Sequence, residues 1–136
     1  MFTKVAVITG AANGFGRALA IALGQQGFSL ALIDTDTEGC ERTALELPGR
    51  TVTVHPLDVT NAQAVNVVCA EIAAHHGRVD MLINNAGVSM SVPFELARLE
   101  DMQRVFAVNY WGTIHMTQTL LPHLAVQQGS HLVNII

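Results

Sequence analysis

The stretch Thr9-Gly10-Ala11-Ala12-Asn13-Gly14-Phe15-Gly16 decides the fold of this chain, which has 136 residues. An apolar run leads into it, and a helical pattern follows it at once. In such a strand–turn–helix unit, Gly10 makes the tight turn, Gly14 lets the backbone approach a phosphate, and Gly16 lets the helix lie close to the sheet. The free N–H groups at the start of the helix favour an anion. We therefore expect a dinucleotide pyrophosphate here, with Asn13 and Phe15 among its contacts.

The rest of the chain alternates strands with helices. Strand-length apolar runs lie at Lys4–Thr9, Ser29–Asp34, Met81–Asn84 and Leu132–Ile136, and helical patterns lie at Phe15–Gln26, at Glu38–Leu47 and from near Asn61 to His76. This alternation predicts a doubly wound parallel sheet in a single α/β domain, residues 1–136. Polar and apolar residues alternate in Thr51–His55, which is typical of an edge strand. The last run, Leu132–Ile136, is nearly all apolar, so we expect it to need a further strand beside it.

A carboxylate ends the second strand. Three glycines alone fit an ordinary strand-to-helix turn as well as a dinucleotide site. Asp34, however, follows Gly16 at the distance where an acidic side chain accepts both hydroxyls of the adenosine ribose and repels a 2′-phosphate. No Arg or Lys lies between Gly10 and Gly16 or immediately after Asp34, so we predict NAD in preference to NADP. The alternative is that Asp34 or Asp36 caps the helix that begins near Thr37, or turns the chain into it.

Composition argues against several other classes of protein. The formal net charge is −4 and the seven basic residues are scattered, which argues against a nucleic-acid partner. No apolar run approaches the roughly 18 residues of a membrane span. Cys40 and Cys69 lie in predicted helices at no metal-ligand spacing, so we expect ordinary small apolar side chains in a reducing, cytoplasmic environment. The six histidines form no metal-binding motif, and we expect no metal site.

With these motifs in place, the chain resembles the short-chain dehydrogenases/reductases. Thr9–Gly16 matches the family's T-G-x-x-x-G-x-G turn, Asn84–Gly87 is identical to its N-N-A-G motif, and Asn109–Gly112 resembles its N-x-x-G. The resemblance covers the whole chain. It implies a Rossmann-type sheet with strand order 3-2-1-4-5 and hydride transfer between NAD and an alcohol or ketone. It also implies cofactor contacts at Asp58, Val59, Asn85, Ala86 and Gly87.

Some of these residues have a structural interpretation as well. Asp58 could cap the helix that begins near Asn61. Asn84–Gly87 could be a turn whose asparagines tie neighbouring strands together. Asn109 lies on an apolar helix stripe with Phe106, so we expect it to be buried and hydrogen-bonded, because an unsatisfied buried amide costs roughly 1–3 kcal/mol. A satisfied core asparagine would meet that need. In the family the matching asparagine disturbs the helix and holds a water on the proton path to the catalytic lysine, which implies a catalytic role for Asn109.

The family's catalytic serine and its Y-x-x-x-K pair follow the fifth strand, and these 136 residues hold no counterparts. Tyr110 is the only tyrosine, Ile114 stands four residues after it, Lys4 is the only lysine, and Ser130 precedes the strand. We therefore expect the chain as written to bind dinucleotide weakly and to catalyse nothing. We also expect the uncovered last strand and fourth helix to favour homo-oligomers or partial unfolding. The alternative is a shortened, non-enzymatic homologue that senses NAD or regulates a partner.

Overall fold

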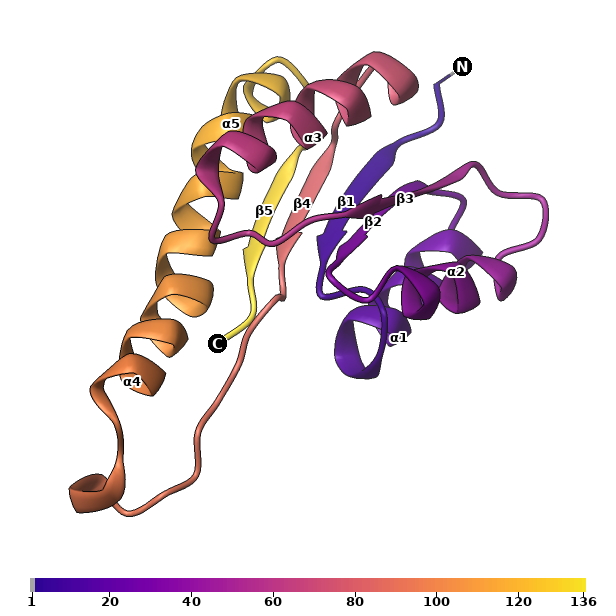
Figure 1. Ribbon diagram of the computed structural model, residues 1–136. Coiled ribbons are helices and arrows are strands. Elements are labelled where there is room, and N and C mark those ends of the chain that lie inside the picture. The colour runs from indigo at the N-terminus through magenta and orange to yellow at the C-terminus, as the bar shows by residue number, and fades with distance from the viewer. Residues whose placement is uncertain (1) are drawn as a thin grey trace.

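The computed structural model describes residues 2–136 as a five-stranded parallel sheet between two layers of helices (Figure 1). The strands are β1 (Val5–Thr9), β2 (Ser29–Asp34), β3 (Val52–Pro56), β4 (Met81–Asn84) and β5 (His131–Asn134). The helices are α1 (Gly14–Gln25), α2 (Thr37–Leu45), α3 (Ala62–His76), α4 (Leu99–Phe106) and α5 (Thr113–Ala125), with a 3-10 turn η1 (Phe94–Leu96) and a π-helical segment η2 (Ala107–Gly112). The strand order β3-β2-β1-β4-β5 confirms the expected doubly wound fold.

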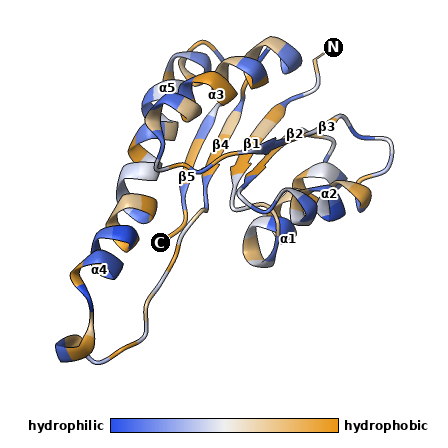
Figure 2. Ribbon diagram, viewed as in Figure 1, coloured by the Kyte–Doolittle hydropathy of each residue, from blue (hydrophilic) through white to orange (hydrophobic). Residues whose placement is uncertain are grey.

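The central strand β1 is buried throughout and supplies both halves of the core. Val7 packs in the cluster that α3 and α5 cover, whereas Ala6 and Ile8 pack in the cluster that α1 and α2 cover. Figure 2 shows apolar residues along β1, whereas β5 and the helices also carry hydrophilic residues. Cys69 lies in the first cluster and Cys40 in the second, and both are free thiols. Burial raises the pKa of each thiol to about 12, so both behave as the small apolar side chains that we predicted.

The last strand differs from its prediction. β5 covers His131–Asn134 instead of Leu132–Ile136, because the pairing with the short β4 runs from the pair Met81 and His131 to the pair Asn84 and Asn134. Most of its side chains are exposed, and β4 is its only neighbour within residues 2–136. β3, whose alternating pattern predicted an edge strand, forms the opposite edge. No helix in this part of the chain has the length and hydropathy to cross a membrane.

Three consecutive helical segments, α4, η2 and α5, form one long rod, and its middle segment η2 is π-helical. α4, η2 and α5 follow one another without a break, and α4 projects past the end of the sheet (Figure 1). The family resemblance implies a helix that is disturbed at Asn109, and the structure has π-helical turns at that position. π-Helical segments are rare in proteins overall, and those that occur often lie at functional sites.

Two histidines and a threonine join the edge strand β3 to α3. Thr53 Oγ1 lies 2.8 Å from His76 Nε2 and 2.8 Å from His55 Nε2. Burial lowers the pKa of both imidazoles. Glu71 opposes this shift at His55, whereas the nearby ring of His75 adds to it at both residues. The contact of His55 and His76 with Thr53 is therefore most stable when both imidazole rings are neutral.

We expect the free energy of unfolding to fall as the pH drops below about 6.5, the value of an unperturbed histidine. Because the folded pKa values lie below that of the unfolded chain, the unfolded chain binds more protons in this window, and acid favours it. Urea denaturation between pH 5 and 8 measures the effect. The double variant His55→Gln, His76→Gln should show a flatter profile, and a profile as steep as that of the wild type would contradict this assignment.

Candidate functional site

An open cleft of about 380 Å³ lies at the carboxyl ends of the strands. The order of the sheet reverses between β1 and β4, and open α/β sheets bind their ligands at such a point. The lining comes from the turn after β1, the ends of β2 and β3, the loop after β4 and the rod α4–η2: Gly10, Asn13, Phe15, Ile33, Asp34, Thr35, Leu57, Asp58, Val59, Asn85, Ala86, Gly87, Val88, Arg104 and Val108. Nine of the predicted contacts are among them, whereas Gly14, Gly16 and Asn109 lie just outside.

The glycine-rich turn has the close packing that its spacing predicts. Gly10 has φ +67°, which makes the tight turn off β1. A Cβ at Gly16 would collide with the carbonyl oxygen of Gly10 and with the side chain of Asn85. A Cβ at Gly14 would meet no protein atom within 4 Å, so the space in front of the first turn of α1 is open. The space in front of Gly14 is therefore free of protein side chains, and the N–H groups of Ala11 and Ala12 bond the carbonyl oxygen of Ile33 and the carboxylate of Asp34.

Thr9, the last residue of β1, clamps this turn to the loop after β4. Its buried hydroxyl accepts hydrogen bonds from the N–H groups of Asn85 (3.0 Å) and Ala86 (2.9 Å). The Asn85 side chain donates to the carbonyl oxygens of Thr9 (3.1 Å) and Gly10 (3.2 Å). The sequence motif includes Thr9, but this positioning role was missed, because it depends on a residue 76 positions away.

The first asparagine of the N-N-A-G motif ties the sheet together. Asn84 Nδ2 donates to Asn134 Oδ1 on β5 (3.0 Å) and to Thr117 Oγ1 on α5 (3.1 Å). Together with the bonds of Asn85 to β1, this confirms that the two asparagines join neighbouring strands. The structural interpretation of the motif therefore holds, and the loop that follows it still lines the cleft.

The half-buried carboxylate of Asp34 braces the turn after β1. Its two oxygens accept hydrogen bonds from the N–H groups of Ala12 and Asp36, each at 3.1 Å. The cap of α2 is Asp36, which accepts from the N–H of Gly39 at 2.9 Å. Of the two alternatives, Asp34 thus turns the chain and Asp36 caps the helix. Each Asp34 oxygen keeps a lone pair for a ligand hydroxyl.

Asp58 does not cap α3. Its Oδ1 accepts from the N–H (3.0 Å) and the hydroxyl (2.8 Å) of Thr60, whereas Asn61 caps the helix by accepting from the N–H of Ala64. The capping alternative was wrong because a turn separates Asp58 from the helix. The two bonds from Thr60 and the charge of Arg104 lower the pKa of Asp58, against a smaller opposing effect of burial. The exposed carboxylate is therefore ionised at the rim of the cleft.

Asn109 is exposed, not buried as predicted. The stripe on which it lies is covered only at its α5 end, where Met116 is fully buried, and Phe106 remains 66% exposed. The expectation of hydrogen-bond partners is nevertheless confirmed. Asn109 Nδ2 donates to the carbonyl oxygen of Val88 (2.9 Å), and the Val88 N–H donates to Asn109 Oδ1 (2.8 Å). The side chain thereby pins the loop after β4 to the π-helical segment.

Three arginines near the cleft were missed. Arg104 lines the cleft itself, and Arg17 and Arg42 line a second hollow beside Ala12 and Asn13. Arg17 directly follows Gly16, and this position beside the glycine-rich turn is the sequence signal that marks it. Arg17 pairs with Glu46 at 3.2 Å and Arg42 with Asp36 at 3.8 Å. Residues 2–136 contain no group of three or more His, Cys, Asp or Glu side chains that could hold a metal ion.

Comparison with known proteins gives consistent matches. A family model for short chain dehydrogenases matches residues 4–136. The putative oxidoreductase SadH of Mycobacterium tuberculosis is 38% identical over 134 residues, which are 97% of this chain and 49% of that protein. This chain spans about half the length of the curated relatives that it matches.

Two solved structures show the same fold with bound cofactors. The 3-ketoacyl-(acyl-carrier-protein) reductase from Brucella melitensis, complexed with NADH, has a TM-score of 0.91 and 33% identity over 98% of this chain and 57% of that one. The alcohol dehydrogenase from the archaeon Thermococcus sibiricus, complexed with 5-hydroxy-NADP, has a TM-score of 0.86 and 34% identity over 90% of this chain and 53% of that one. With the sheet order and the motifs around the cleft, the match over residues 4–136 shows that this chain belongs to the short-chain dehydrogenase family.

Proposed function

We propose that residues 1–136 are the cofactor-binding part of an NAD-dependent oxidoreductase that transfers hydride between the nicotinamide and a small alcohol or carbonyl compound. The observation that carries the proposal is Asp34, an acceptor held at the cleft by two backbone N–H groups directly beside the glycine-rich turn. The relatives named above act, by their names, on an alcohol and on a ketoacyl group, which supports the substrate class.

The residues around the cleft fit a dinucleotide in one orientation. The open space before Gly14 suits the pyrophosphate, and Asp34 suits the hydroxyls of the adenosine ribose. Asp58 suits the adenine amino group, and the loop Asn85–Gly87 suits the nicotinamide ribose. When bound, the nicotinamide would supply or accept the hydride. Asn109 would act by holding the loop after β4 in place beside it.

The carboxylate of Asp34 also supports NAD in preference to NADP. A 2′-phosphate at the ribose would meet its negative charge. Of the three arginines near the cleft, Arg17 pairs with Glu46 and Arg42 with Asp36, and the charge of Arg104 acts on Asp58. We therefore expect the chain to bind NADH more tightly than NADPH. Because these 136 residues contain no Y-x-x-x-K pair, we expect no turnover of any alcohol.

Titration of NADH and NADPH fluorescence against Asp34→Ala and Asp34→Asn tests this function. Both variants remove the repulsive charge, so both should reduce the difference in affinity between NADH and NADPH. Asp34→Ala should also lose roughly tenfold to a hundredfold in NADH affinity, because it loses hydrogen bonds to a charged acceptor. Asp34→Asn keeps one acceptor oxygen and should lose less. Equal affinities of the wild type for NADH and NADPH would contradict the assignment, and no binding of either would contradict the proposed function itself.

We propose in addition that the protein is a cytoplasmic homo-oligomer. Support for the location is the pair of free, buried thiols, Cys40 and Cys69. Support for association is the aromatic surface on α4 and η2, where Phe106, Tyr110 and Trp111 are 66%, 51% and 52% exposed. Light scattering that gives the mass of a folded monomer at all concentrations would refute the association.

A further inference from the structure

His115, near the start of α5, contacts the backbone on the adenine side of the cleft. Its Nδ1 lies 2.8 Å from the carbonyl oxygen of Val59. A carbonyl oxygen can only accept a hydrogen bond, so Nδ1 carries a proton and donates it. His115 does not line the cleft itself, and none of the motifs includes it. Its contact therefore acts on the site only through Val59.

Val59 is held a second time through its side chain. Gly112, the last residue of η2, faces it so closely that a Cβ at this position would lie 2.5 Å from Val59 Cγ2. Val59 is only 6% exposed although it lines the cleft. Gly112 thus packs closely against the side chain of Val59, and His115 donates a hydrogen bond to its carbonyl group.

The loop that carries Val59 has few other attachments. The side chain of Asp58 bonds only within this loop, to Thr60. The N–H of Leu57 bonds the carbonyl oxygen of Asp34 at the start of the loop. Within residues 2–136, the bond from His115 is the hydrogen bond that ties the stretch from Asp58 to Thr60 to a different layer of the fold.

We propose that His115 is a positioning residue that holds Val59, and with it the carboxylate of Asp58, in the place where the adenine of the dinucleotide binds. The inference rests on the proposed function, because it requires a nucleotide in the cleft. The rod that carries His115 also carries Asn109, which holds Val88 at the other side of the cleft. One helix therefore sets the positions of both rims.

Two substitutions separate the hydrogen bond from the bulk of the ring. His115→Leu removes the donor and keeps an apolar side chain of similar size. His115→Asn keeps a donor, because the amide nitrogen of asparagine occupies nearly the position of imidazole Nδ1. The two halves of the cofactor serve as probes: AMP for the adenine side and nicotinamide mononucleotide for the other side. Affinities come from NMR titration of the 136-residue chain, and melting temperatures without ligand report stability separately.

His115→Leu should weaken AMP binding roughly three- to tenfold, the loss expected for one hydrogen bond, and leave nicotinamide mononucleotide unchanged. His115→Asn should restore AMP binding to within about twofold of the wild type. Long-range proton–nitrogen spectra of the wild type should show the Nδ1–H tautomer of His115. Equal AMP affinity of the wild type and His115→Leu, an equal loss for both probes, no rescue by His115→Asn or an Nε2–H tautomer would overturn the inference. A wild-type chain that binds neither probe nor NADH would overturn the proposed function and the inference with it.

Discussion

Gly14→Ala is expected to lower the affinity for NADH by about a hundredfold while the chain stays folded. The new Cβ would meet no protein atom within 4 Å, so nothing in the fold resists its volume. It would stand in the open space before the first turn of α1, where the proposed pyrophosphate approaches the backbone. Displacing that group by a methyl removes several hydrogen bonds, and a hundredfold change corresponds to about 2.7 kcal/mol. Fluorescence titration with NADH measures the loss.

Gly49→Ala is the matched control. Gly49 has φ +77° and Gly14 has φ +55°, and a Cβ at either meets no neighbour. Both substitutions should therefore lower the free energy of unfolding by roughly 1–2 kcal/mol, the usual cost of an L residue in the left-handed region. Only Gly14 lies at the proposed pyrophosphate site. If Gly49→Ala reduced NADH affinity as much as Gly14→Ala, the loss would reflect the fold and the pyrophosphate would not bind at the turn.

The parts of the site that the sequence predicts are those that depend on short stretches of chain. The turn Thr9–Gly16 and the carboxylate at Asp34 each follow a strand directly, so their placement at one edge of the sheet follows from a parallel arrangement. The strand order was an implication of the family resemblance. The placement of the turn and of the carboxylate required no knowledge of which side chains meet across the fold.

The remaining features depend on contacts between distant segments. Asn109 was expected to be buried because it lies on the apolar side of a helix, but it is exposed. Periodicity shows which side of a helix is apolar and does not show how far the covering layer extends. The clamp formed by Thr9 and the bond from His115 to Val59 join residues 76 and 56 positions apart. These features become visible only when the layers are assembled.

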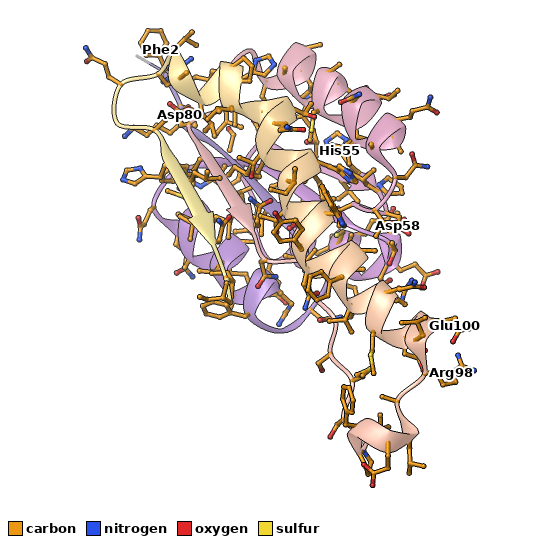
Figure 3. The ribbon with its side chains drawn as sticks, turned by 90° about the vertical axis from the view of Figure 1, so that its left-hand side faces the viewer. Phe2, His55, Asp58, Asp80, Arg98 and Glu100 are labelled. Carbon is orange, nitrogen blue, oxygen red and sulfur yellow. The ribbon has the colours of Figure 1, made fainter. Side chains whose placement is uncertain are left out.

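At the end of the sheet opposite the cleft, the buried residue Asp80 joins three strands through its carboxylate and its backbone. Asp80, directly before β4, accepts from the N–H of Val5 at 2.9 Å and from Arg78 at 2.6 and 2.8 Å. Its backbone bonds Val5 on β1 and His131 on β5. The Arg78 guanidinium stacks over the ring of Phe2, 4.7 Å from its centre, and Figure 3 shows Phe2 and Asp80 at one end of the molecule and Arg98 at the other.

Asp80→Asn is expected to lower the free energy of unfolding by roughly 1–3 kcal/mol, because it removes the buried negative charge that accepts hydrogen bonds from Arg78 and from the N–H of Val5. The side chain of Asp80 is only 3% exposed. Burial alone would raise its pKa, but the bonds from Arg78 and Val5 and the charges of Arg78 and Lys4 outweigh burial and lower it. The carboxylate therefore stabilises the fold above the unfolded pKa, near 3.9, and this contribution is lost as the pH falls through the lower folded value.

Urea denaturation at pH 7 and at pH 3 to 4 measures both effects, and Asp80→Asn should show a weaker acid dependence than the wild type. Asp101→Asn is the control, since Asp101 forms a similar two-point pair with Arg98 on the surface, at 3.0 and 3.3 Å, with exposed side chains. An exposed pair contributes little, so this variant should unfold almost as the wild type does. The cleft lies at the other end of the strands, so folded Asp80→Asn should keep its NADH affinity, whereas Gly14→Ala should lose it. If both Asp80→Asn and Asp101→Asn left stability unchanged, the stabilising role assigned to the buried pair would be wrong.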